Sequence, residues 1–453
     1  MIVSKFSLED EQHVTYTADD FSVQQLGECE FDSPLLPLLD YRQHTVNYVE
    51  ESDRILVENT ISAVSKCSDS TDELFGLEPA GARRKIFFNP ATTKAAIVTC
   101  GGLCPGLNNV IRSLTNELCR RYEIDKVYGI GDGYQGFISD HLRGPVELTP
   151  KSVENIHEHG GTVLGSSRGQ QSPAAIVDCL EDLEIDILFI IGGDGTIRGG
   201  MGIADEIAAR DRKISVIGVP KTIDNDIMFT DQSFGFQTAL SEGTSAIRSA
   251  HVEACGCPQG VGLVKLMGRH SGFIACYSSL AVSDANFVLI PEVPFELEGE
   301  NGLFASLKRR LNRSGNAVIV VAEGAGQHLM EQTEKTDASG NKKFGDVGVW
   351  LKAEIENHFE DQSLPLNLKY IDPSYAIRSV PANSYDSVFC TRLAHNAVHA
   401  AMSGRTKMVV SRWHTKFVHV PMELAIGQRN CVDPNGDLWM TVLESTGQPP
   451  CWH

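Results

Sequence analysis

Two short segments, rich in glycine and in carboxylates, hold the side chains of this chain that could carry out a reaction. Residues 192–196 read GGDGT, and residues 220–226 read PKTIDND. Each segment follows an apolar run with the length of a buried strand, residues 187–191 and 214–219 respectively. In a parallel sheet the carboxyl ends of neighbouring strands meet at one edge, where ligands bind. The two segments therefore predict a phosphoryl-transfer site at that edge.

The glycine-rich segment is suited to holding a polyphosphate and a metal ion. Glycine has no Cβ, so the backbone can approach phosphate closely. Asp194 supplies a hard oxygen ligand of the kind that Mg²⁺ requires. The alternative is a glycine-rich turn in which the aspartate only caps a helix. The apolar run before the segment favours the functional interpretation.

The second segment offers a hydroxyl and two carboxylates beside a lysine. If the segment is extended, alternation places Thr222, Asp224 and Asp226 on one side. One carboxylate could then accept the proton of an attacking hydroxyl, while the other orients Lys221 or the metal. A positioned general base is worth about 10²–10⁴ in rate. The alternative is an Asx-rich turn with no catalytic role.

Further positions could contact phosphate or sugar, each with a purely structural alternative. The turn at residues 101–102 could approach phosphate or simply join a strand to a helix. Arg269 could grip a phosphate with its guanidinium fork or form a surface salt bridge. Glu323 could bind sugar hydroxyls or cap a helix, and Tyr375 with Arg378 could hold a phosphate or pack on the surface.

Strand-like and helix-like runs alternate along most of the chain and would position these residues. The strand-like residues 94–100 precede apolar residues at helical spacing over 107–118. Further strands are expected at residues 127–130, 261–266, 287–290 and 317–321. This alternation predicts an α/β fold with two Rossmann-like three-layer α/β domains and mostly parallel sheets, plus an N-terminal extension.

The composition excludes several other classes of function. The 453 residues are 42% hydrophobic and 22% charged, as in an ordinary globular protein. The formal net charge of −20 argues against sequence-independent nucleic-acid binding. No run of about 18 apolar residues occurs, so no membrane span is expected. The 12 cysteines include no CxxC pair, which argues against structural zinc. Without a signal-like apolar run at the N-terminus, the thiols indicate a reduced, cytoplasmic protein.

Taken in order, the motifs resemble those of the 6-phosphofructokinase family. They are GGLCPGLNNVIR at 101–112, GGDGT, PKTIDND, KLMGRHSGF at 265–273, AEG at 322–324 and PSYAIR at 373–378. The set is similar to the atypical ATP-dependent branch of the pyrophosphate-type group, which includes trypanosomal and plant enzymes. The resemblance implies transfer of the ATP γ-phosphoryl group to the 1-hydroxyl of fructose 6-phosphate, with Mg²⁺ as cofactor and a homotetramer as the assembly.

The resemblance also implies a role for individual residues. Asp224 would be the general base, with Lys221 and Asp226 as its catalytic neighbours, and Asp194 would hold Mg²⁺. The implied ATP-binding residues are Gly101, Arg168, Gly169, Gly193, Asp194, Gly195 and Thr196. The implied residues for fructose 6-phosphate are Thr222, Ile223, Asp224, Met267, Gly268, Arg269, Glu323, Tyr375, Ala376, Ile377 and Arg378.

Four segments are expected along the chain. Residues 1–90 would be an acidic extension that packs on the body of the protein or on another subunit. Residues 91–229, completed by about 379–440, would bind ATP, and residues 230–378 would bind fructose 6-phosphate. Residues 441–453 would form a C-terminal tail.

Two positions disagree about the phosphoryl donor. Pyrophosphate-using relatives tend to have an acid where this chain has Gly195, and an acid there would repel the α-phosphate region of ATP. Lys221 points the other way, because typical ATP enzymes have glycine at that position. The atypical ATP branch carries both residues, so ATP is expected and pyrophosphate dependence is the alternative.

Two other functions fit part of the pattern. NAD kinases and lipid kinases also use a GGDGT loop, but they are not expected to carry the TIDND and MGR segments at these places. A non-catalytic paralogue that binds nucleotide or sugar phosphate would be indicated by the loss of Asp194 or Asp224, and both are present.

Overall fold

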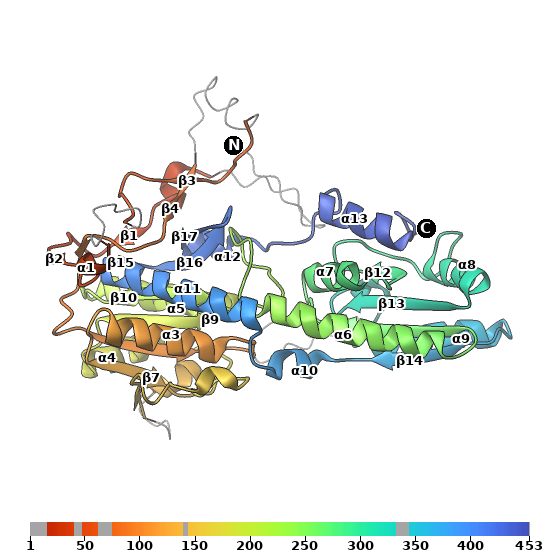
Figure 1. Cartoon of the computed structure of the whole chain (residues 1–453), viewed down its shortest axis with the longest axis horizontal. Helices are drawn as coiled ribbons and strands as arrows, with labels where there is room; N and C mark the ends of the chain where they lie inside the picture. The colour runs from red at the N-terminus through yellow and green to blue at the C-terminus, as the bar shows by residue number, and fades with distance from the viewer. Residues whose placement is uncertain (1–15, 40–47, 62–74, 139–143, 332–343, 453) are drawn as a thin grey trace.

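Two β-sheets, each with helices on both faces, organise the molecule. The computed structural model describes residues 16–39, 48–61, 75–138, 144–331 and 344–452. The larger sheet lies at one end of the molecule and the smaller sheet at the other; the long helix α11 covers the larger sheet, α6 covers the smaller one, and the two helices meet near the middle (Figure 1). The expected α/β fold with mostly parallel sheets is confirmed.

The larger sheet has nine strands, in the order β3-β4-β17-β16-β10-β9-β6-β7-β8. Neighbours from β16 to β7 in this order pair in parallel, and the outer strands pair antiparallel. Strand β9 is buried along its whole length, which explains why its sequence is a continuous apolar run. The bounds are β3 Ile55–Leu56, β4 Gly76–Pro79, β17 Lys416–Pro421, β16 Met408–Trp413, β10 Ser215–Pro220, β9 Ile187–Gly192, β6 Lys94–Thr99, β7 Lys126–Ile130 and β8 Val146–Glu147.

Helices cover both faces of this sheet. Helices α3 (Leu107–Arg120) and α11 (Ser384–Met402) pack together on one face. Helices α4 (Pro173–Asp182), α5 (Asp194–Ala209) and α12 (Met422–Gly427) lie on the other. The start of α4 follows from its sequence: the Ser172 hydroxyl accepts a hydrogen bond from Ala175 N, and proline suits the first helical position.

The smaller sheet has four parallel strands in the order β12-β13-β11-β14. Helices α6 and α7 pack on one face, and α8 and α9 pack on the other. The short helix α10 follows β14. The bounds are β11 Gly260–Leu266, β12 Phe287–Leu289, β13 Asn316–Ala322, β14 Asn367–Ile371, α6 Phe236–Cys255, α7 Phe273–Val282, α8 Leu303–Ser314, α9 Val347–Asp361 and α10 Ser374–Ser379.

N-terminal residues add to the larger sheet and its surroundings. Strand β4 pairs with β17, and β3 pairs with β4. A buried carboxylate, Glu78 on β4, accepts hydrogen bonds from Arg83 and from Arg405 in the C-terminal half. Two short pairs complete this region: β1 (Gln24–Gln25) with β15 (Arg405–Thr406), and β2 (Phe31–Asp32) with β5 (Lys85–Ile86). The short helix α1 spans Leu36–Leu39.

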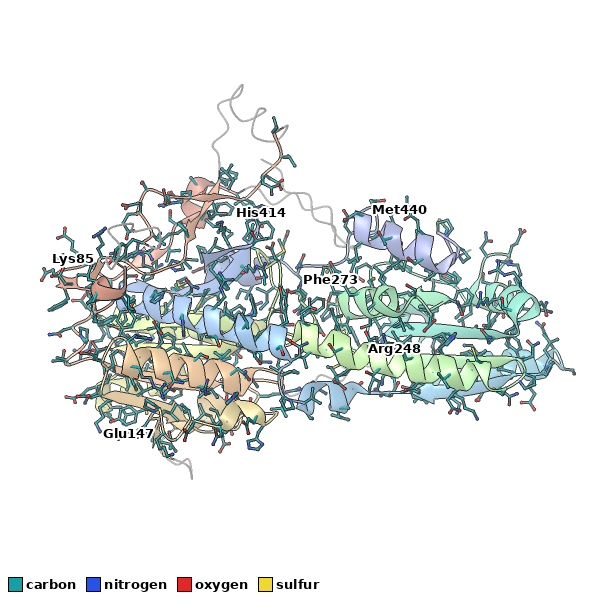
Figure 2. All side chains as sticks on the ribbon, viewed as in Figure 1. Lys85, Glu147, Arg248, Phe273, His414 and Met440 are labelled. Carbon is teal, nitrogen blue, oxygen red and sulfur yellow. The ribbon has the colours of Figure 1, made fainter. Side chains whose placement is uncertain are left out.

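The C-terminal residues pack on the smaller sheet. Helix α13 (Asp437–Thr446) lies against α7 and β12, so residue 441, the expected start of a tail, falls inside a helix. Figure 2 shows Met440 on the outer side of α13, where it is 58% exposed. Beyond the helix, Trp452 is 2% exposed and packs against Phe287 and Phe295. Apolar burial of a large ring holds this segment in place.

Among the described residues, no helix is long and apolar enough to cross a membrane.

Candidate active site

The strand ends of the larger sheet bring the two glycine- and acid-rich loops together. Pro220 at the end of β10 lies beside Gly192 at the end of β9, and Lys221 N donates to Gly192 O at 2.9 Å. Strand β6 ends at the same level, because Thr99 pairs with Ile191. The turn after β6 and the loops after β9 and β10 are therefore neighbours at one sheet edge, as the sequence predicted.

The loop after β9 leads directly into helix α5 and leaves open space beside it. Gly193 precedes the helix, and Asp194 is its first residue. Gly193 O accepts from Thr196 N at 2.9 Å, which begins the helical turn. A Cβ on Gly192 would overlap the Thr196 side chain, whereas a Cβ on Gly195 would meet no atom within 4 Å. The free N–H groups of a helix N-terminus attract anions, so this end of α5 suits phosphate.

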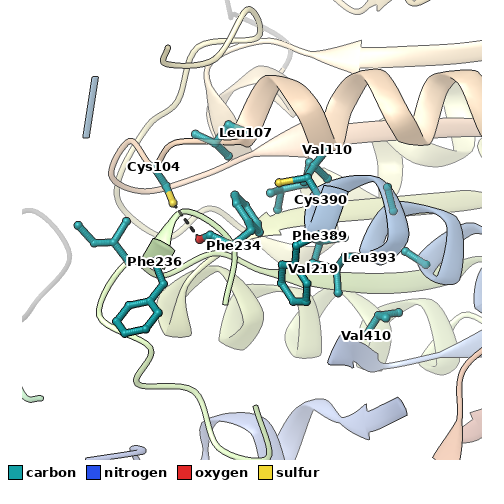
Figure 3. Close-up of a cluster of buried hydrophobic side chains, with 14 of the residues drawn as sticks. Cys104, Leu107, Val110, Val219, Phe234, Phe236, Phe389, Cys390, Leu393 and Val410 are labelled. Atoms are coloured by element: carbon teal, nitrogen blue, oxygen red, sulfur yellow. Dashed lines mark hydrogen bonds between the residues drawn. The ribbon is translucent and has the colours of Figure 1, made fainter. Parts of the chain in front are cut away.

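The turn after β6 is fixed by buried packing beneath it. Gly106 has a φ of +100°, and a Cβ there would lie 2.7 Å from the sulfur of Cys390. Figure 3 shows the Cys104 Sγ donating to the carbonyl oxygen of Phe234, at 3.3 Å, among buried apolar side chains. This packing holds the 101–106 turn on a rigid base.

Three cationic side chains converge on this turn. Lys221 Nζ lies 3.8 Å from the position of a Cβ on Gly101. Arg168 Nη2 and Arg378 Nη1 each lie 3.6 Å from the position of a Cβ on Gly102. Burial lowers the pKa of Lys221, and the carboxylate of Asp224 opposes that effect. The arrangement can take up negative charge that develops at the turn.

The loop after β10 is not extended, and the prediction of an extended segment with alternating side chains is wrong. Asn225 has a φ of +57°, a left-handed conformation that asparagine tolerates. Its Oδ1 accepts from Ser233 N at 2.8 Å, which ties the turn to the chain that follows. Thr222 Oγ1 still reaches Asp226 Oδ1 at 2.7 Å, and Asp224 N donates to Thr222 Oγ1 at 3.1 Å. Local side-chain hydrogen bonds have replaced strand geometry here.

Asp224 lies where the two sheets meet. Its Oδ2 accepts from Arg269 N at 3.4 Å, and its buried Oδ1 has no hydrogen-bond partner in the part of the chain that the structure describes. Burial, followed by the charges of Asp226 and Glu323, raises the pKa of Asp224 to about 7. A carboxyl group with a pKa near neutrality and an unoccupied acceptor atom is suited to general-base catalysis.

The smaller sheet supplies the other side of the site from its own strand ends. Leu266 of β11 pairs with Ala322 of β13, so Met267, Gly268 and Arg269 emerge beside Glu323. Glu323 N donates to Leu266 O at 2.9 Å. Gly268 has a φ of +129°, which a side chain rarely adopts.

Asp194 is the residue best placed to hold a metal. Burial raises its pKa, and the nearby Asp226 carboxylate adds to the rise. Two carboxylates that repel one another at a helix N-terminus fit a divalent cation that binds oxygen ligands. Among the described residues no group of three or more His, Cys, Asp or Glu side chains could hold an ion by itself. The donor set therefore fits an ion that shares its ligands with a phosphate substrate, as Mg²⁺ does.

Sequence reasoning missed Arg429. Its guanidinium lies 3.5 Å from Asp194 and 3.8 Å from Asp226, although it comes from the segment after α12. The signal in the sequence, a polar stretch over 428–430 between apolar runs, does not indicate which loop it contacts.

The other expected site residues differ in how exposed they are. Gly169, with a φ of +105°, has open space around it. The side chains of Ile223 and Ile377 are buried in the core, so only their backbone can face a ligand. Tyr375 is 81% exposed, with its ring 5.3 Å from the Arg378 guanidinium. Ala376 is exposed and Met267 is half-buried.

Comparison with known proteins adds to the geometry. Residues 94–401 match the phosphofructokinase family. The chain is 52% identical to the ATP-dependent 6-phosphofructokinase of Amycolatopsis methanolica over 96% of both chains. It is 46% identical to the ATP-dependent 6-phosphofructokinase of Trypanosoma brucei brucei, over 82% of this chain and 76% of that relative.

A solved structure shows the same fold. The pyrophosphate-dependent phosphofructokinase of Marinobacter aquaeolei superposes with a TM-score of 0.65 at 19% identity, covering 80% of this chain and 92% of that chain. At this identity the likeness concerns the fold alone.

Proposed function

The chain belongs to the phosphofructokinase family, and from this premise we propose that it is an ATP-dependent 6-phosphofructokinase. It transfers the γ-phosphoryl group of ATP to the 1-hydroxyl of fructose 6-phosphate, giving fructose 1,6-bisphosphate and ADP. Relatives of 46–52% identity that carry the name ATP-dependent 6-phosphofructokinase support the activity.

The position of Asp224 is the observation that carries the mechanism. Its buried, unpartnered Oδ1 can accept the proton of the sugar 1-hydroxyl as that oxygen attacks phosphorus. The backbone N of Arg269, 3.4 Å away, donates a hydrogen bond to the other oxygen. Glu323 and Arg269, on the strand ends of the smaller sheet, would orient the sugar phosphate toward this base.

Cations at the 101–102 turn would meet the negative charge of the transferred group. Lys221, Arg168 and Arg378 surround the 101–102 turn. Preorganised cations of this kind stabilise a phosphoryl-transfer transition state without a cost of reorganisation during the reaction. Asp194, with Asp226 nearby, would hold Mg²⁺, which neutralises donor phosphate charge when bound.

The donor assignment rests on the space around Gly195. A Cβ there would meet no atom within 4 Å, so the protein itself does not fill this volume. A nucleotide can occupy it, whereas an acidic side chain would both fill it and repel the α-phosphate. Lys221, whose Nζ lies 3.8 Å from the position of a Cβ on Gly101, favours the second candidate, a pyrophosphate-dependent phosphofructokinase, because typical ATP enzymes have glycine at this position.

The same proposal extends to the organisation of the chain. Residues 91–229 and about 379–440, around the larger sheet, would bind ATP, and residues 230–378, around the smaller sheet, would bind fructose 6-phosphate. The assembly would be a homotetramer.

A donor comparison tests the function. Purified protein is given fructose 6-phosphate with either MgATP or magnesium pyrophosphate at matched concentrations, and fructose 1,6-bisphosphate is measured with a coupled aldolase assay. We expect turnover with MgATP and at least about 100-fold less with pyrophosphate, a difference of roughly 2.7 kcal/mol in the barrier. The reverse preference would establish the pyrophosphate enzyme, and no turnover with either donor would refute both.

A further inference from the structure

Arg429 reaches the candidate metal site from the segment after α12, which contains none of the sequence motifs. The guanidinium lies between two loops: Nη2 is 3.5 Å from Asp194 Oδ2, and Nη1 is 3.8 Å from Asp226 Oδ2. Asp194 opens α5 after β9, and Asp226 closes the loop after β10. One positive side chain therefore bridges the two carboxylates on which the metal and the base loop depend.

The backbone around Arg429 is held firmly. Arg429 forms an isolated antiparallel bridge with Ile227. The next residue, Asn430, donates from its backbone N to Asp226 O at 2.9 Å and from Nδ2 to Asn225 O at 3.1 Å. Further along, Val432 N donates to Glu292 Oε1 at 2.8 Å. The segment is thus fixed to the base loop whatever its arginine side chain contacts.

The side chain, by contrast, is held loosely. Distances of 3.5 and 3.8 Å exceed those of a charge-assisted hydrogen bond, which are about 2.7–2.9 Å. The Arg429 side chain is 36% exposed, while the Asp194 and Asp226 side chains are 26% and 13% exposed. A charge pair of this length at partial exposure is weak and can be exchanged for another cation at low cost.

We propose that Arg429 is a positioning residue that neutralises Asp194 and Asp226 in the metal-free site and competes with the divalent cation for them. The inference rests on the proposed function, because it assumes that Asp194 holds the metal. Without a cation between them, the two acids would repel each other across the loops. With Arg429 in place, the loops keep their spacing until a metal and its phosphate substrate arrive.

Competition of this kind gives a result that an ordinary structural salt bridge does not. Removing the arginine should lower the thermal stability of the metal-free protein and, at the same time, raise its affinity for a divalent cation. The two effects are linked, because whatever cation binds the folded state stabilises it by mass action.

Binding of Mn²⁺ to the substrate-free protein, followed by electron paramagnetic resonance, measures this directly and does not depend on turnover. We expect Arg429→Gln to bind Mn²⁺ about three- to fivefold more tightly than the wild type, as expected when a partly exposed competing charge is lost. The thermal midpoint of the metal-free variant should fall, and saturating Mn²⁺ should restore most of it. Arg429→Lys keeps the charge but not the forked guanidinium, so its Mn²⁺ affinity should lie between those of the wild type and Arg429→Gln. This variant replaces Arg429→Gln in the comparison if the glutamine variant does not fold.

The matched control is Arg198→Gln. Arg198 lies on α5 close enough for its charge to act on Asp194, but among the described residues it forms no ion pair with a second loop. Its removal should change the Mn²⁺ affinity by less than about twofold. In an Asp226→Asn background, the Arg429→Gln effect should shrink, because the bridge has lost one end.

Several outcomes would overturn the proposal. Unchanged or weaker Mn²⁺ binding by Arg429→Gln would show that the arginine does not compete. An equal effect of Arg198→Gln would assign any tightening to general charge instead of the bridge. If wild-type protein binds Mn²⁺ but transfers no phosphate to fructose 6-phosphate, the proposed function fails while the comparison of variants still decides the role of Arg429.

Discussion

The loops after β9 and β10 lie side by side at one sheet edge, yet they are built in opposite ways. The β9 loop is held by backbone and helix geometry, and it leaves the volume beside Gly195 empty. The β10 loop is held by its own side chains, with Thr222 bonded to Asp226 and Asn225 bonded to Ser233. Under the proposed function, the β9 loop would discriminate between donors through space and the β10 loop would act through charge.

Loss of the base should give the largest effect and tests the charged loop. Asp224→Ser should lower kcat by about 10²–10⁴, because a positioned general base contributes that much. The fold should be retained, since among the described residues the buried Oδ1 has no hydrogen-bond partner and Oδ2 accepts only a long hydrogen bond, from Arg269 N at 3.4 Å. Steady-state kinetics and circular dichroism check this. Turnover within about threefold of wild type would remove Asp224 from the mechanism.

Removal of the lysine charge should come next. Lys221→Met keeps the length of the side chain and deletes the cation beside Gly101. We expect kcat to fall about 10²–10³-fold, the typical loss for one preorganised stabilising group. Lys126→Met is the control, since that lysine forms an exposed pair with Glu147. A fall in fructose 6-phosphate affinity with unchanged kcat would contradict a role in the transition state.

An acid in the open volume tests whether the β9 loop discriminates through space. Gly195→Asp should reduce kcat/KM for MgATP by roughly 10²-fold, because a like charge facing phosphate costs several kcal/mol when desolvated. Pyrophosphate use should fall less or rise, and this ratio is the quantity to measure. Gly144→Asp adds the same charge at another glycine with open space beside it, and it should leave kcat/KM unchanged for both donors. Equal losses with both donors would mean that Gly195 does not set donor choice.

The pKa of about 7 for Asp224 predicts two opposite dependences on pH. Activity needs the deprotonated base, so kcat/KM should rise about tenfold per pH unit below about pH 7 and level off above it. Stability runs the other way: an unfolded aspartate has a pKa of about 3.9, so the folded protein is penalised progressively between about pH 4 and 7. Asp224→Ser should remove this part of the stability profile. If the stability of metal-free Asp224→Ser depends on pH in the same way as that of the metal-free wild type, the raised pKa of Asp224 is contradicted.

The smallest expected effect is on stability, and it is tested by comparing Gly192 with Gly195. Gly192→Ala should cost about 1–3 kcal/mol, because its Cβ would overlap the buried Thr196 side chain. Gly195→Ala should be neutral or stabilising by up to about 1 kcal/mol, since alanine favours a helix and nothing obstructs it. Urea denaturation of both variants measures the difference. Equal costs would show that the volume beside Gly195 is not free.

Much of the candidate site could be predicted from where the strands end in the sequence. The apolar runs before GGDGT and PKTIDND have the length of a buried strand. The carboxyl ends of neighbouring parallel strands lie at the same edge of the sheet. The expected strands at 127–130, 261–266, 287–290 and 317–321 all lie in the structure, as β7, β11, β12 and β13. Periodicity was sufficient because continuous burial leaves few alternatives to a parallel strand.

The form of the loops did not follow from the sequence. Alternation suggested that Thr222, Asp224 and Asp226 share a side of an extended segment, whereas Asn225 turns the chain into a left-handed conformation. A hydrogen bond to Ser233, eight residues away, decides between these two forms. Propensity alone does not reveal which distant backbone group will satisfy a side chain.

The sequence by itself determined the α/β class and the strands that precede the two glycine- and acid-rich loops, because continuous apolar runs of this length indicate buried strands. Only the tertiary structure decided that Arg168, Lys221 and Arg378 meet at one turn. It also decided that Arg429, more than 200 residues beyond Asp194 and Asp226, bridges them. Contacts between distant segments depend on how whole layers pack, and no local pattern in the chain records that packing.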